Sequence, residues 1–396
     1  MIFFFIIVFL IFVELLVYRL VKYLKNDFQW IVENKDYFPN YTKQLVKKYN
    51  NEIFNKDLGW DNKKKNKKEY LNSIKKQFIY FFDKDGSRIT KNNFKQKKFA
   101  IFGDSYAMSR YSNDKESLQY FLEIYTKSKI FNHGVGNYGL DQVYLKIKKK
   151  INKNMKNIIV IFVPETISRN QSYWKHFLEF GNILAFKPVF KLNKNKLILE
   201  NKHINKLNLR NVKQKIIYLK KRDFFYKNKF KKLSFSFPYT VCFFKNFLFN
   251  FSIFYHLIIF KVTRKNLFYQ KAYYQIIKKN LIEAQKFYLR KDFSDLTSNI
   301  ILKINSYLKK KGKNIYFFVL PQLIDIKIFK KFNNSYKFYN KLNTSKNIKI
   351  FDLTKKMTSI KNINNYYIED MYGGHLNKKG NKFVSKIIFR ELKNNS

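Results

Sequence analysis

The sequence is poor in cysteine and in metal-binding patterns. Its single cysteine, Cys242, excludes an intrachain disulfide and any zinc site built from several cysteines. The histidine, cysteine and acidic residues show no metal-ligand spacing such as HExxH or CxxC. We therefore expect no metal ion and no other cofactor.

Acidic residues are also scarce, at 27 against 80 lysines and arginines, which gives a net charge of +53. Such a charge is typical of nucleic-acid binding or of contact with an anionic membrane. However, the lysines are spread along the whole chain, and Lys, Asn, Ile, Phe and Tyr are abundant together, as AT-rich codon usage would produce. No zinc finger, RNP or helix-turn-helix motif accompanies the charge, so we expect no nucleic-acid partner.

The N-terminus is apolar over Ile2–Tyr18, 17 residues with Glu14 as their one charge. That length is at the short end of the range for a membrane-spanning helix. No small-residue cleavage site follows; Arg19, Lys22 and Lys25 come next. The pattern favours an uncleaved membrane anchor over a signal peptide.

Apolar runs of strand length alternate with amphipathic helical patterns in two parts of the chain, which predicts a parallel sheet covered by helices. The predicted strands are Phe99–Phe102, Ile158–Val163, Ile315–Leu320 and Ile348–Leu353. The predicted helices carry Leu118–Tyr125 (after a capping box at Asn113 and Glu116), Leu296–Tyr307 and Phe383–Ile388. We divide the chain into an anchor (1–20), a stalk (21–95), the first part of an α/β core (96–170), an insertion (171–290) and the second part of the core (291–396).

The insertion is rich in aromatic residues. Phe237–Val262 is apolar but contains several polar residues, which favours a buried helical segment, with a second membrane contact as the alternative. Tyr173, Trp174 and Phe177 suit stacking on sugar rings or packing in a core, and core is the default for such residues.

Parallel α/β sheets place functional residues at the carboxyl ends of their strands. Gly103, Asp104 and Ser105 follow the first predicted strand. A serine becomes a nucleophile only with a base within hydrogen-bond reach, and an ordinary turn is the alternative reading.

Two further loops carry residues that could complete such a site. Asn132–Gly139 contains three glycines, whose unobstructed N–H groups can hold an oxyanion, unless the loop serves only as a turn. It also contains His133, a second candidate for the site. Near the C-terminus, His375 follows Asp370 on a glycine-rich loop, which supplies a base and a residue to orient it.

The order serine, glycine loop, Asp/His resembles the SGNH (GDSL-type) hydrolase family. The resemblance is carried by FAIFGDSY (99–106), FNHGVGNYGLDQ (131–142) and DMYGGHLNKKGN (370–381). The segment Pro164–Phe190 resembles a subgroup found in bacterial surface-polysaccharide loci. The family implies a three-layer α/β/α, flavodoxin-like parallel sheet, here with a helical insertion and an N-terminal membrane helix.

The resemblance also implies roles. Ser105 attacks an ester carbonyl, His375 transfers the proton, and Asp370 orients His375. The oxyanion is held by the backbone N–H groups of Ser105 and of Gly136 or Asn137. Thr166 takes the place of the family's third-block asparagine.

Two positions depart from the family pattern. The family's acid lies three residues before the histidine, where this chain has Tyr372. Glu165 and Asn170 compete with Thr166 for the third-block role.

The first hypothesis is therefore a hydrolase that removes an acyl group, acetyl above all, from a carbohydrate or lipid. The alternatives are an O-acyltransferase of polysaccharide assembly and a non-catalytic carbohydrate-binding protein on the same scaffold. Basic residues after the apolar helix favour a cytoplasmic body by the positive-inside rule. The resemblance favours the periplasmic side of a bacterial inner membrane, and that is our expectation.

Overall fold

The structure is a computed structural model that describes residues 1–63, 66–71, 74–194, 196–368 and 370–395. The chain forms two compact units. The first comprises residues 1–50, 172–186 and 206–277, and the second comprises residues 51–171, 187–205 and 278–396.

The second unit is built on a parallel sheet. Its strands, within the described residues, are β5 (Phe99–Gly103), β6 (Ile130–Asn132), β7 (Asn157–Phe162), β10 (Asn314–Val319) and β11 (Ile350–Asp352). They lie in the order β6-β5-β7-β10-β11, and every neighbouring pair is parallel. This is the flavodoxin-like order 2-1-3-4-5. The prediction of a parallel α/β sheet is confirmed, and β6 is the strand that the sequence pattern missed.

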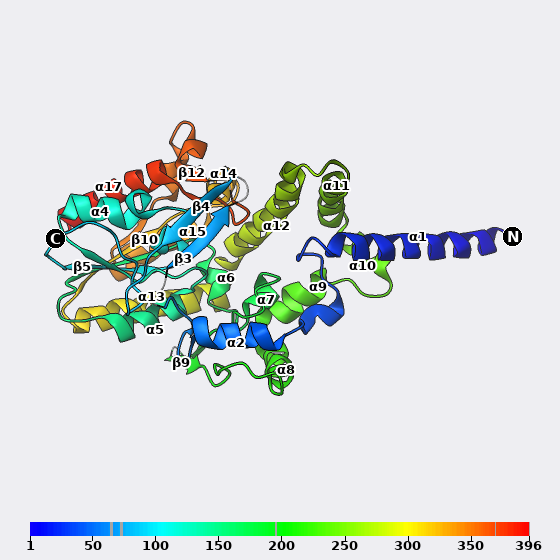
Figure 1. The fold of residues 1–396 in the computed structure, drawn as a ribbon, viewed down its shortest axis with the longest axis horizontal. Coiled ribbons are helices and arrows are strands. Elements are labelled where there is room, and N and C mark those ends of the chain that lie inside the picture. The colour runs from blue at the N-terminus through cyan, green and yellow to red at the C-terminus, as the bar shows by residue number, and fades with distance from the viewer. Residues whose placement is uncertain (64–65, 72–73, 195, 369, 396) are drawn as a thin grey trace. The chain divides into compact units, whose positions relative to one another are not determined.

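Helices cover both faces of this sheet (Figure 1). On one face α4 (Leu118–Thr126) packs against α17 (Lys378–Asn394), and on the other α5 (Leu140–Lys150) packs against α13 (Lys291–Lys310). Alternate strand residues point to opposite faces, and both sets are buried, because helices exclude water from each side. The continuous apolar runs of the sequence follow from this double coverage.

The start of α4 differs in detail from the sequence prediction. Asn113 and Glu116 do form a capping box, but it lies at the start of the short 3₁₀ helix Asp114–Glu116 and not at the start of α4. Ser117, whose side chain accepts a hydrogen bond from the backbone N–H of Tyr120, caps α4 itself.

The segment expected to form a stalk is divided between the two units. Residues 21–50 belong to the first unit and residues 51–95 to the second. In the second unit β3 (Lys67–Leu71) and β4 (Lys76–Tyr80) pair antiparallel. Phe78 and Tyr80 are buried in a cluster with Met108 and Tyr111. This part of the chain therefore packs on the α/β core beside the loop that follows Ser105.

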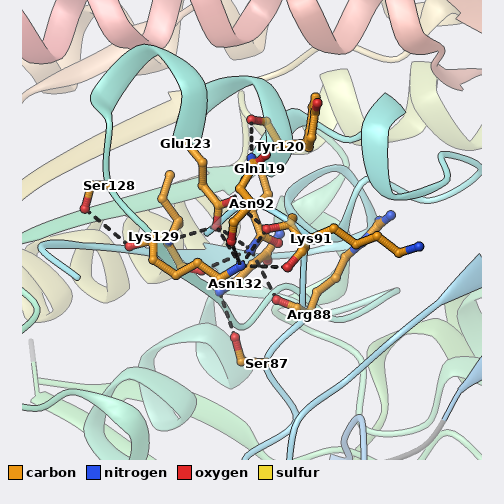
Figure 2. Close-up of polar contacts among 12 residues, drawn as sticks. Ser87, Arg88, Lys91, Asn92, Gln119, Tyr120, Glu123, Ser128, Lys129 and Asn132 are labelled. Carbon is orange, nitrogen blue, oxygen red and sulfur yellow. Dashed lines mark hydrogen bonds and ion pairs between the residues drawn. The ribbon is translucent and has the colours of Figure 1, made fainter. Parts of the chain in front are cut away.

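A buried carboxylate of α4 binds both the strand β6 and the loop that precedes β5 (Figure 2). Glu123 accepts hydrogen bonds from the backbone N–H of Ile130 at 3.0 Å and from Gln119 at 3.1 Å. Its other oxygen accepts from Thr90 and from Asn92 at 2.5 and 3.0 Å. Gln119 and Asn92 also donate to backbone oxygens, whereas for the backbone N–H of Ile130 and the Thr90 hydroxyl the buried Glu123 carboxylate is the acceptor.

We expect Glu123→Ala to lower the free energy of unfolding by about 2–4 kcal/mol, because it leaves the buried Ile130 N–H and Thr90 hydroxyl without an acceptor. Urea unfolding of the full chain in detergent measures this change. Ile124→Ala, an exposed position on the same helix, is the matched control and should stay within about 0.5 kcal/mol of the wild type. A loss no larger than that of the control would contradict the role assigned to Glu123.

The insertion is not helical throughout. Between its helical parts, β8 (Val189–Asn193) and β9 (Lys196–Glu200) form an antiparallel hairpin that belongs to the α/β unit. Residues 172–186 belong instead to the first unit, where Tyr173, Trp174 and Phe177 are buried. These three aromatic side chains are therefore core residues, as expected from the sequence, and are not free to stack on sugar rings.

The first unit contains the apolar N-terminal helix α1 (Ile2–Lys25), which is long and apolar enough to cross a membrane. It also contains α10 (Tyr239–Lys245) and α11 (Phe247–Thr263), which pack against α1. The segment is helical, as expected, and Ile253 and Phe254 are buried. The expectation that it is buried as a whole is wrong, because Val241, Phe244 and Leu248 are exposed.

Candidate active site

Ser105 lies at the carboxyl end of β5, as the first residue of the short helix α3 (Ser105–Met108). Gly103 makes this turn possible. Its φ is +149°, and a Cβ there would lie 1.8 Å from the backbone oxygen of Ile161 on β7. Only glycine lets the two strands approach so closely just before the serine. The strand order reverses between β5 and β7, which is where such folds place their ligands.

Asp104 holds the serine turn in place. Its carboxylate accepts hydrogen bonds from the backbone N–H of Tyr106 at 2.9 Å and of Val163 at 3.1 Å. The Arg169 guanidinium lies 3.3 Å away and also binds Glu165 at 2.8 Å. Burial raises the pKa of Asp104 above its ordinary value, and the charge of Arg169 and the two backbone N–H groups oppose that rise.

Arg88, from the loop before β5, supports the same turn from its far end. Its guanidinium donates to the backbone oxygens of Met108, Ser109 and Ser112 at 2.5, 2.9 and 2.6 Å. The buried guanidinium therefore fixes the backbone at residues 108–112, just after the turn that carries Ser105.

His375 reaches the site from the C-terminal part of the chain. It begins the short strand β13 (His375–Leu376), which pairs with β12 (Tyr367–Ile368). Gly373 and Gly374 before it have φ of +100° and +90°, which other residues rarely adopt. The imidazole stacks on Tyr106 with ring centroids 5.1 Å apart, and the Tyr106 hydroxyl donates to the backbone oxygen of Gly374.

The structure brings Ser105, His375 and Asp370 together. His375 Nε2 lies 2.9 Å from Ser105 Oγ, and both residues are buried. His375 Nδ1 is hydrogen-bonded to Asp370 Oδ2, which also accepts the His375 backbone N–H at 3.1 Å. This chain of contacts has the connectivity of a nucleophile, a base and an orienting acid.

Asp370 reaches the imidazole from five residues upstream because the loop folds around its carboxylate. Asp370 Oδ1 accepts the backbone N–H groups of Tyr372 at 2.6 Å and of Gly374 at 3.3 Å. Burial alone would raise the pKa of Asp370. The charge and hydrogen bond of His375, the charge of Arg110 and the Tyr372 N–H outweigh burial and lower that pKa below its ordinary value.

The lowered pKa predicts an acid-dependent loss of stability. The ionised form of Asp370 stabilises the fold above its unfolded-state pKa, about 3.9, and this stabilisation is lost as the pH falls through the lower folded-state value. We therefore expect the difference in unfolding free energy between wild type and Asp370→Asn to be constant above about pH 5 and to shrink below about pH 4. Urea unfolding between pH 3 and 7 measures it. Asp85→Asn, at an exposed carboxylate, is the control. If the difference in unfolding free energy from wild type were independent of pH for Asp370→Asn as well as for the control, the prediction would be wrong.

The glycine loop lies against the serine turn. Asn132 donates to the backbone oxygen of Ala107 at 2.9 Å, and a Cβ on Gly134 would lie 2.4 Å from the backbone nitrogen of Met108. His133 does not join the triad: it is buried, stacked on Phe102 with centroids 5.1 Å apart, and burial lowers its pKa well below the ordinary value.

Gly136 and Asn137 line a cavity of about 360 Å³, together with Met108 and Arg110 of the turn that follows Ser105. Asn137 has φ of +64°, a conformation that asparagine tolerates better than most residues. The Trp60 indole N–H donates to the Gly136 oxygen at 3.2 Å, which fixes this part of the loop. The cavity is also lined by polar side chains from residues 52–69, including Asn62, Lys67 and Glu69.

Of the three third-block candidates, two already have polar partners. Glu165 binds Arg169, and Asn170 accepts from the backbone N–H of Leu140 at 2.9 Å and donates to Thr297 at 3.2 Å. Thr166 begins α6 (Thr166–Arg169) and is fully buried, and its hydroxyl has no hydrogen-bond partner among the described residues. Thr166 is therefore the candidate whose polar group is unused.

Sequence reasoning missed Tyr106, Arg110 and Trp60. Tyr106 adjoins the serine, but nothing in its spacing shows that it stacks on the histidine. Trp60 lies in the segment expected to form a stalk, and its place beside the glycine loop follows from long-range packing. Within the described residues, no group of three or more histidine, cysteine or acidic side chains could hold a metal ion.

No family model and no curated protein matches the sequence. Among solved structures, the chain is similar to a protein from Desulfitobacterium hafniense DCB-2 that is designated lipolytic and of the G-D-S-L family. The similarity covers 75% of this chain and 99% of that one, with 10% sequence identity and a TM-score of 0.33. At this TM-score the function is to be inferred from the geometry of the site.

Proposed function

We propose that this chain is a membrane-anchored serine esterase of the SGNH class. The observation that carries the proposal is the contact of 2.9 Å between Ser105 Oγ and His375 Nε2, with Asp370 on the other ring nitrogen. A decayed, non-catalytic scaffold would have no need to keep a nucleophile, base and acid in hydrogen-bond contact.

In the proposed reaction, Ser105 Oγ attacks the ester carbonyl as His375 Nε2 takes its proton. The tetrahedral intermediate expels the alcohol, which receives that proton, and an acyl-serine remains. Water, deprotonated by His375, then attacks the acyl group and releases the acid and free Ser105. Asp370 holds the imidazole in the tautomer that presents Nε2 to the serine and stabilises its charged form.

We assign the oxyanion to the backbone N–H groups of Ser105 and of Gly136 or Asn137, with the Thr166 hydroxyl as a further donor. Support for Thr166 comes from its burial without a polar partner among the described residues. A buried hydroxyl without a hydrogen bond is costly, and a bound oxyanion would supply the missing partner.

The proposed substrate is an acylated, above all acetylated, carbohydrate. The cavity beside Gly136 is lined by Trp60, Asn62, Lys67 and Glu69, which combine an aromatic side chain with amide and charged groups. Such a lining suits a sugar, with its apolar ring faces and many hydroxyls, better than a long acyl chain. A sugar hydroxyl in place of water would turn the same acyl-serine chemistry into acyl transfer.

We further propose that α1 anchors the protein in a bacterial inner membrane, with the site on the periplasmic side. The length and hydropathy of α1 support the anchor. The resemblance of residues 164–190 to a subgroup found in bacterial surface-polysaccharide loci supports the side.

The proposal predicts that Ser105→Ala abolishes both labelling by a fluorophosphonate probe and hydrolysis of p-nitrophenyl acetate. Asp370→Asn should lower kcat/KM on the order of 10²–10⁴-fold, because the imidazole loses its orienting anion. Ser306→Ala, at an exposed serine of α13, is the control and should leave both readouts unchanged. Labelling that persists in Ser105→Ala would refute the assignment of the nucleophile.

Thr166→Val keeps the shape of the side chain but removes its hydroxyl. We expect kcat to fall by about 10²–10³-fold with little change in KM, because the hydroxyl would act only in the transition state. Steady-state kinetics in the full chain measure this, with thermal unfolding as the check on folding. An unchanged kcat would remove Thr166 from the oxyanion site and leave the other assignments intact.

A further inference from the structure

The helix pair α10 and α11 presents an apolar surface beside α1, in the same unit. The two helices meet at a bend of 105°. Asn250 donates to the backbone oxygens of Cys242 and Phe243 at 3.3 and 2.9 Å, and so satisfies carbonyl groups that the bend leaves free. Leu248, just after the bend, is 81% exposed. An exposed apolar surface of this extent requires a partner.

The length of α1, compared with the thickness of a bilayer, indicates that the partner of this surface is lipid. Its side chains are all exposed from Ile2 to Phe12, which is about 16 Å of helix. A bilayer's hydrocarbon core is about 30 Å thick, so a spanning α1 must also place its following residues within the membrane. These are the residues beside which α10 and α11 pack.

Glu14 links the two elements at this depth. It accepts hydrogen bonds from the backbone N–H groups of Tyr239 and Thr240 at 2.6 and 2.9 Å, and from the Thr240 hydroxyl at 2.7 Å. A carboxylate and free helix N–H groups are each costly in a hydrocarbon environment. Here each satisfies the other, so the start of α10 lies at the depth of Glu14.

Both ends of the helix pair are tied to the C-terminal end of α1. The Tyr239 hydroxyl donates at 2.7 Å to Glu33, which also binds Lys22 and Lys25 at the end of α1. At the other end of the pair, Lys261 forms an ion pair with Asp27. The pair therefore starts beside the middle of α1, at Glu14, and ends beside its C-terminal end, so it does not reach the side of the membrane where α1 begins.

We propose that α10 and α11 insert into one leaflet of the membrane, the leaflet that holds the C-terminal half of α1. Val241, Phe244, Leu248 and Phe251 would lie among the acyl chains. Lys245, at the bend, would extend its ammonium group to the lipid headgroups. This inference rests on the proposal that α1 spans the bilayer, and it is independent of the chemistry at Ser105.

The test uses the full chain with Cys242→Ser, so that each variant carries one introduced cysteine. Phe5→Cys on α1, Leu248→Cys on α11 and Tyr70→Cys on β3 are all at positions exposed by more than half, at 61, 81 and 57%. Each is labelled with bimane and reconstituted into phosphatidylcholine vesicles containing phosphatidylglycerol. Quenching is measured with a doxyl-labelled lipid and, separately, with aqueous iodide.

We expect the lipid quencher to act on the probes at residues 5 and 248 and not on the probe at 70, with iodide giving the reverse. If residue 5 is quenched by lipid and residue 248 is not, α1 spans the membrane and the leaflet proposal is overturned. A residue 248 shielded from both quenchers would overturn it too, in favour of a second copy or another protein. If neither residue meets lipid, the anchor itself fails.

Glu14 gives a second readout. In Glu14→Ala the α10 N–H groups lose their acceptor, so lipid quenching at residue 248 should fall, whereas Glu14→Gln keeps an acceptor oxygen and should retain most of it. Equal quenching in both variants would overturn the role of Glu14 in holding the pair at membrane depth.

Discussion

The contact between Ser105 and His375 joins residues 270 positions apart, and the organisation of the α/β unit follows from the need to make it. Each partner is held by a different device. The serine is fixed by a strand end, a glycine that permits close strand approach and the buried Asp104. The histidine is fixed by a loop wound around Asp370. The two segments meet at the edge of the sheet where the strand order reverses.

Two arginines balance the carboxylates at this edge. Arg169 is shared by Asp104 and Glu165, while Arg110 and His375 favour the ionised form of Asp370. Glu69, which binds Arg110 at 3.1 Å, has its pKa lowered to about 2, since Arg110 and Lys67 outweigh the effect of its burial.

The sequence was informative where structure is local or periodic. Buried strands read as continuous apolar runs, and serine and histidine stood out because their neighbours were glycines and acids. The fold of residues 51–95 could not be read, because Trp60 and Tyr80 are placed by contacts with residues far along the chain. The reach of Asp370 depends on two backbone hydrogen bonds that spacing alone does not reveal. Composition also could not tell an apolar helix facing protein from one such as α11, whose apolar side chains remain exposed.

Tyr106 follows the nucleophile directly in the chain. Its ring stacks on the imidazole of His375, and its hydroxyl donates a hydrogen bond to the Gly374 backbone oxygen. A displacement of the serine turn therefore drags the C-terminal loop in the same direction. We therefore expect thermal motion of this region to shift the two reactive groups together, with their separation varying less than the position of either one. One aromatic residue thus gives two remote segments the stiffness of a single element.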